Sequence, residues 1–171
     1  MTTNTQTASK LNDIMNAPLR QTGFDIPEGS YPGTLFGFGE PTMIPVAEQF
    51  RKPGGPSATL KFEMRFGLRV KDSVQEVAYL VPVPEGGSVN RRSNLFKACR
   101  AMRPDLFNHE GAFNADVTLQ SFIGSPATVQ VKKNKKDFPQ VEAVASPMQG
   151  VVCPTMEECA ALTAGSDGIP F

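Results

Sequence analysis

The chain has 171 residues, and its 17 Lys and Arg residues balance its 17 Asp and Glu residues. This length is enough for one domain with its own hydrophobic core. No apolar run approaches the roughly 18 residues that cross a bilayer, and the polar N-terminus lacks the apolar region of a secretory signal. The three cysteines also lack paired spacing. These features argue against a membrane or secreted protein and predict a cytoplasmic one with reduced thiols.

The N-terminal half of the chain contains the clearest strand signals. Residues 1–23 are short and polar and predict a flexible arm. A turn at residues 26–30 precedes a predicted strand over residues 31–39, and the Gly- and Pro-rich residues 48–57 predict a long exposed loop. Over residues 60–70 apolar side chains alternate strictly with polar residues or glycine. That alternation predicts a strand with one buried and one solvated face.

The C-terminal half adds a helix and further strands. A third strand is predicted over residues 74–83. Ser93 is a predicted N-cap for a helix over residues 94–103. Two more strands are predicted over residues 127–131 and 140–144, and a lysine-rich connection joins them.

Five strands with one helix between the third and the fourth are the element order of an OB-fold barrel. An SH3-like barrel and a β-sandwich are alternatives, but neither explains the position of the helix as well. The 15 Gly and 15 Pro residues likewise favour a turn-rich β fold. The predicted fold is therefore mainly β: a five-stranded OB-fold barrel over residues 24–147, with a flexible arm over 1–23 and an acidic tail over 148–171.

A search for catalytic chemistry finds no convergent set of reactive groups. His109 is the single histidine and lies in a polar segment that has the composition of an exposed loop. The sequence has no zinc-ligand spacing, phosphate-binding glycine loop or nucleophile elbow. We therefore expect a binding protein that is not an enzyme, with no cofactor and no metal site.

The zero net charge is an average over unlike segments. Residues 1–50 hold 2 basic and 5 acidic residues, residues 51–104 hold 11 and 4, and residues 105–171 hold 4 and 8. The middle of the chain is thus strongly cationic, and the four lysines of residues 132–136 form a second cationic group. This distribution permits a nucleic-acid partner, because phosphate contacts depend on local rather than total charge.

Basic and aromatic residues in this cationic region are candidates for contacts with a single strand. Basic residues along one strand face can follow a phosphate backbone, and exposed aromatic rings can stack on bases. The plain alternatives are a solvated strand face, a charged tip that protects an edge strand, and aromatic rings that belong to the core. The predicted DNA-binding residues are Lys61, Arg65, Arg69, Arg91, Arg92, Lys132, Lys133, Lys135, Lys136, Phe36, Phe38, Tyr79 and Phe138.

The last residues, Ser166-Asp167-Gly168-Ile169-Pro170-Phe171, present an aromatic ring, an aliphatic side chain and a carboxylate on a backbone stiffened by proline. This end resembles the C-terminal tip of bacterial single-stranded-DNA-binding proteins, which close with acidic residues followed by Ile-Pro-Phe. The body is similar to the divergent single-strand binders coded by phages, through its Gly29-Ser30-Tyr31 opening strand. The resemblance implies an OB-fold body and a tip, Asp167, Ile169, Pro170 and Phe171, that recruits host replication and repair enzymes.

The leading hypothesis is a protein that binds and protects single-stranded DNA without strong sequence preference during phage replication, recombination or repair. In that case it acts in the host bacterial cytoplasm. A homo-oligomer is expected, because OB barrels with exposed edges commonly pair. The alternatives are a structural protein of the virion or its assembly, and an inhibitor of a host enzyme that acts through the tail.

Overall fold

The structure is a computed structural model and describes residues 15, 26–84 and 86–166. The predicted N-terminal arm, apart from Met15, and the predicted tip over residues 167–171 lie outside the described residues. The elements in chain order are β1 (Gly29–Phe38), β2 (Thr42–Pro45), η1 (Glu48–Phe50), β3 (Ala58–Val70), β4 (Ser73–Pro82), α2 (Asn94–Met102), η2 (Pro104–Leu106), η3 (Leu119–Phe122), β5 (Pro126–Lys133), β6 (Pro139–Ala145) and α3 (Met156–Ser166).

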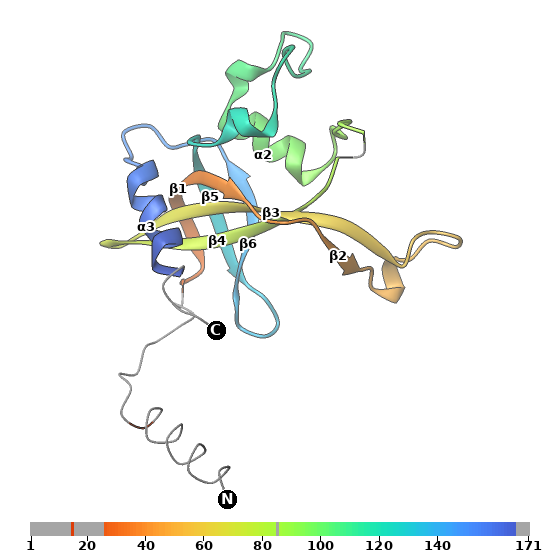
Figure 1. Cartoon of the computed structure of the whole chain (residues 1–171), viewed down its shortest axis with the longest axis horizontal. Coiled ribbons are helices and arrows are strands. Elements are labelled where there is room, and N and C mark those ends of the chain that lie inside the picture. The colour runs from red at the N-terminus through yellow and green to blue at the C-terminus, as the bar shows by residue number, and fades with distance from the viewer. Residues whose placement is uncertain (1–14, 16–25, 85, 167–171) are drawn as a thin grey trace, which may run out of the picture.

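The strands form one antiparallel sheet of six strands organised around β3 (Figure 1). One edge of β3 pairs first with β2 and then with β1, and its other edge pairs with β4. The free edge of β1 pairs with β5, which pairs in turn with β6. The strand order is therefore β4-β3-β1-β5-β6, and β2 extends the sheet beyond the end of β1.

The element order predicts a barrel of five strands, whereas the structure has six strands in an open sheet. β3 begins at Ala58 and its first residues project past β1, so the short strand β2 can pair with them. The outermost strands β4 and β6 approach each other, but no ladder of hydrogen bonds joins them within the described part of the chain. Within residues 26–84 and 86–166 the architecture is thus mainly β, with one open antiparallel sheet and two α-helices. The prediction of a five-stranded barrel is corrected to an open sheet of six strands.

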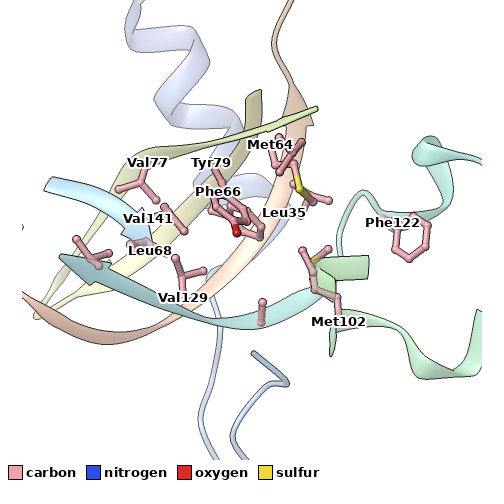
Figure 2. Close-up of a cluster of buried hydrophobic side chains, with 14 of the residues drawn as sticks. Leu35, Met64, Phe66, Leu68, Val77, Tyr79, Met102, Phe122, Val129 and Val141 are labelled. Atoms are coloured by element: carbon pink, nitrogen blue, oxygen red, sulfur yellow. The ribbon is translucent and has the colours of Figure 1, made fainter. Parts of the chain in front are cut away.

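The alternation correctly predicts the core side of β3 over residues 62–70, whereas Leu60 at the start of the pattern is 42% exposed. Phe62, Met64, Phe66 and Leu68 point inward and are at most 5% exposed. They pack against side chains of β1, β4, β5, β6 and α2 (Figure 2). Each fully buried side chain of this size stabilises the folded state by about 1.5–3 kcal/mol, so this alternation sets the register of the sheet.

Helix α2 confirms the predicted helix to within one residue. The Ser93 hydroxyl accepts a hydrogen bond from the backbone N–H of Phe96, as an N-cap does. Leu95, Cys99 and Met102 are buried on the side of α2 that faces the sheet. The helix ends before Pro104, which cannot continue it.

Helix α3 lies in the segment predicted to be an acidic tail. The backbone N–H of Glu158 donates to the hydroxyl of Thr155, which precedes the helix. Cys159 is fully buried, and the backbone carbonyl of Pro154 accepts a hydrogen bond from the buried Thr34 hydroxyl of β1. Residues 154–159 are therefore packed on the sheet. The composition does not predict this, because small residues rather than large apolar ones dominate the segment.

No helix in residues 26–84 and 86–166 is long and apolar enough to cross a membrane.

Candidate nucleic-acid interface

A cleft of about 480 Å³ lies where the sheet fails to close, between β4 and β6. Its wall includes Lys61 of β3 and Leu80 of β4, and opposite them Lys132 of β5 and Glu142 of β6. Leu80, Lys132 and Glu142 are exposed positions that alternate with buried neighbours, so these side chains leave the sheet on its outer face. The cleft is therefore a solvent-accessible groove across the outer face of the sheet.

The cleft brings together two cationic groups that are far apart in the sequence. Lys61, one of the basic residues predicted to follow one strand face, lines the cleft together with Lys132 and Lys133 at the start of the lysine-rich connection. Lys132 Nζ lies 2.9 Å from Glu142 Oε1, and this hydrogen-bonded carboxylate raises the pKa of Lys132. Both side chains are exposed, so water screens the pair and a phosphate can compete with the carboxylate.

The row Lys61, Arg65 and Arg69 does not act as one cationic face. Arg65 Nε lies 3.5 Å from a Glu63 carboxylate oxygen and 3.7 Å from one of Glu76. Arg69 donates two hydrogen bonds of 2.7 and 2.8 Å to the Glu158 carboxylate of α3. Lys61 has no ion pair among the described residues. The structure thus leaves only the cleft end of the predicted row available for phosphate.

The Arg69–Glu158 pair fixes α3 to the sheet. The hydrogen bonds from Arg69, followed by the backbone N–H of Thr155, hold the pKa of the Glu158 carboxyl at about 2. The same pair raises the pKa of Arg69. Both groups are therefore charged at neutral pH and satisfied by each other, which removes Arg69 from the candidate interface.

The β5–β6 hairpin, of which Lys133 and Gln140 line the cleft, carries an exposed aromatic ring next to lysines in the chain. Asn134 Oδ1 accepts hydrogen bonds from the backbone N–H groups of Lys136 and Phe138, and this closes a tight turn. The Phe138 ring is 62% exposed, and Lys135 and Lys136 are exposed beside it in the chain. Lys133 is half-buried, with its ammonium 3.8 Å from Asp137. An exposed ring beside cations is the combination that single strands require.

Of the other predicted stacking rings, Tyr79 lies in the core, Phe38 packs against it, and Phe36 is half-buried. Tyr79 is among the residues that line the cleft, but it is only 7% exposed and burial raises the pKa of its hydroxyl, so its ring is not an exposed platform (Figure 2). Phe38 packs on Phe62 with ring centroids 5.7 Å apart, and Phe36 is half-buried. A bulge between Leu35 and Gly37 shifts the alternation of β1, which lets both Leu35 and Phe38 face the core.

A second exposed ring, Phe50, was not among the predicted residues. It belongs to η1 in the connection between β2 and β3 and is 71% exposed. Arg51 and Lys52 follow it directly and are exposed as well. The sequence signal was an aromatic residue inside a Gly- and Pro-rich loop, where no core position is available. In Figure 1 this connection extends away from the body at the end of β3 that carries Lys61.

Arg91 and Arg92 lie on the turn that leads into α2. The Asn90 side chain accepts a hydrogen bond from the backbone N–H of Arg92, and both arginine side chains are exposed. Asn94, the first residue of α2, lines the cleft. Neither arginine lines the cleft itself, but both lie within three residues of Asn94 along the chain.

Within the ranges that the structure describes, no three His, Cys, Asp or Glu side chains gather as a metal site would require. His109 is 91% exposed in its side chain and lies 3.9 Å from Glu110. No protein-family model, curated protein or solved structure matches this chain.

Proposed function

We propose that this protein binds single-stranded DNA in the cleft between β4 and β6 and on the two loops beside it. One observation carries the proposal: Phe138 is exposed in the hairpin that follows Lys132 and Lys133, and these two lysines line the cleft together with Lys61. Bases stack on exposed aromatic rings regardless of sequence, and cations beside such a ring can bind the phosphates of the same strand.

We further propose that the body is a divergent OB fold. β1, β3, β4, β5 and β6 follow one another with the helix α2 between the third and fourth of them, and β4 and β6 are the two strands left unjoined. OB folds are partly open five-stranded barrels that bind oligonucleotides on the second and third strands and on the loops after the first and fourth. Here those parts are β3, β4, the connection that carries Phe50 and the hairpin that carries Phe138.

In this account each part of the interface has a separate task. Lys61, Lys132 and the lysines of the β5–β6 hairpin neutralise phosphates and release counterions. Phe138 and Phe50 stack on bases, each contributing about 1–3 kcal/mol of binding free energy. These contacts do not distinguish one base from another, which suits protection of transient single strands during replication, recombination or repair.

Titration of fluorescently labelled oligo-dT at several salt concentrations tests this function. We expect binding whose logarithmic affinity falls linearly with the logarithm of salt concentration, with a slope of about −0.7 for each phosphate that the protein neutralises. Absence of binding at low salt, or binding that does not depend on salt, would contradict the proposal.

The C-terminal residues Asp167, Ile169, Pro170 and Phe171 are proposed to recruit host replication and repair enzymes. The support is the sequence of the tip, which offers a ring, an aliphatic side chain and a carboxylate to a basic-rimmed apolar pocket. Deletion of residues 169–171 is expected to abolish co-purification of such enzymes and to leave the oligo-dT affinity unchanged or raised. Equal loss of both activities would contradict this division of tasks.

A further inference from the structure

A second cationic surface lies on helix α2, separate from the cleft. Arg91, Lys97 and Arg100, which we call the α2 patch, surround a shallow hollow of about 450 Å³. Phe96 and Ser146 also line it, and no acidic residue does. The hollow is therefore a place where an anionic ligand meets several cations and no repulsive carboxylate.

The cations of the α2 patch are not used to stabilise the fold. Arg91, Lys97 and Arg100 are exposed, and none of them forms an ion pair with another residue of the described chain. The nearest acid along the chain, Asp105, is instead held by Arg103 through hydrogen bonds of 2.8–3.2 Å. The three positive charges thus remain available to a ligand.

The α2 patch is connected to the cleft by two elements. Asn94, which lines the cleft, lies three residues after Arg91, which lines the patch. Strand β6 leads from Glu142 in the cleft towards Ser146 beside the patch, a distance of roughly 13 Å at the usual strand rise. A single strand that leaves the cleft over the first turn of α2 meets the patch next.

We propose that the α2 patch is a second phosphate-binding site, which takes the backbone of the same DNA strand after it leaves the cleft. This inference rests on the proposed function and extends it, because it makes the occupied length of DNA longer than the cleft alone allows. Guanidinium groups suit phosphate particularly well, since they bind its oxygens through paired hydrogen bonds.

Oligonucleotides of two lengths distinguish binding at the α2 patch from binding in the cleft. The double variant Lys97→Gln/Arg100→Gln removes two charges from exposed helix positions and keeps residues that favour helix. Labelled oligo-dT of about 6 and of about 20 nucleotides bracket much of the site size of one OB fold, ~4–16 nucleotides. The control variant Lys71→Gln removes one charge at the turn between β3 and β4, far from the cleft end of these strands.

We expect the double variant to bind the long oligonucleotide roughly tenfold more weakly at low salt, with a salt slope shallower by about 1.4. Its affinity for the short oligonucleotide and both affinities of Lys71→Gln are expected to change less than about twofold. If the wild type binds both lengths but the double variant leaves the long one unchanged, the patch is not a DNA site and the cleft proposal stands. If the double variant weakens both lengths equally, the patch is not a second site that only the longer strand reaches, and the proposal of a second site is overturned. If the wild type binds neither length, both proposals fail.

Discussion

The two ends of strand β3 carry the same kind of side chain and have opposite surroundings. At one end Arg69 is locked to Glu158, and α3 covers the sheet so closely that Cys159 is fully buried. At the other end Lys61 lies in an open cleft without an ion pair among the described residues. A row of cations therefore does not define an interface by itself. The acids that packing brings to each end decide which cations remain available.

The substitution Gly67→Val disturbs the packing of α3 on the end of β3 that it covers. A Cβ atom at this position would lie 2.5 Å from the Cys159 sulfur, so a larger side chain must displace α3. We expect Gly67→Val to lower the free energy of unfolding by about 3 kcal/mol, although valine favours strands. Urea denaturation measures this.

Gly37→Ala is the matched control for that substitution. Gly37 has no atom within 4 Å of its Cβ position, so alanine there is expected to change stability by about 0.5 kcal/mol or less. Equal stability of Gly67→Val and the wild type would show that α3 does not rest on this part of the sheet.

Removal of the Phe138 ring tests its contribution to DNA binding. Because the ring is exposed, Phe138→Ala is expected to leave the unfolding midpoint unchanged while it weakens oligo-dT binding by about 1–3 kcal/mol. Phe138→Tyr keeps a ring for stacking and is expected to bind like the wild type. Anisotropy titrations compare the three proteins, and an alanine variant with wild-type affinity would remove Phe138 from the interface.

Removal of one positive charge at each end of β3 tests the difference between the two ends directly. Lys61→Gln is expected to weaken oligo-dT binding about threefold and to make the salt slope shallower by about 0.7, with little change in stability. Arg69→Gln is expected to leave binding within about twofold and to lower the urea midpoint, because Glu158 loses its partner. The opposite pattern would place the DNA on the face that α3 covers.

The smallest expected effect is a pH dependence that belongs to the covered end. The pKa of Glu158 is about 2 in the folded protein, below the value of about 4.3 of a free Glu side chain. The carboxylate therefore stabilises the fold above the unfolded pKa, and this contribution is lost as the pH falls towards 2. Chemical denaturation of the wild type and Glu158→Gln between neutral pH and about 2.5 measures the difference. We expect the gap in stability to close with falling pH, and a constant gap would contradict the ion pair.

The sequence predicts the parts of the fold that depend on local patterns. Strict alternation identifies β3 and its buried face, and Ser93 and Pro104 mark the ends of α2. β2 is only four residues long and without alternation, and its pairing depends on how far β3 projects beyond β1. Whether the barrel closes is decided by the meeting of β4 and β6, which no local pattern encodes.

The sequence predicts residues of the candidate site only where a side chain lies in a turn and is exposed for that reason. Phe138 and its lysines lie in a hairpin tip, so their exposure follows from the sequence. The partner of Arg69 lies 89 residues away along the chain, and strand alternation alone cannot reveal it. The orientation of Phe38 was mispredicted for a different reason, because one bulge reverses the alternation that follows it.

Ultraviolet crosslinking of bound oligo-dT, followed by mass mapping of the modified peptides, tests the location of the DNA most directly. The account predicts crosslinks on Phe138 in the β5–β6 hairpin and on Phe50 in the connection between β2 and β3, the two exposed rings of the proposed interface. Crosslinks confined to α3 and the covered end of the sheet would contradict it.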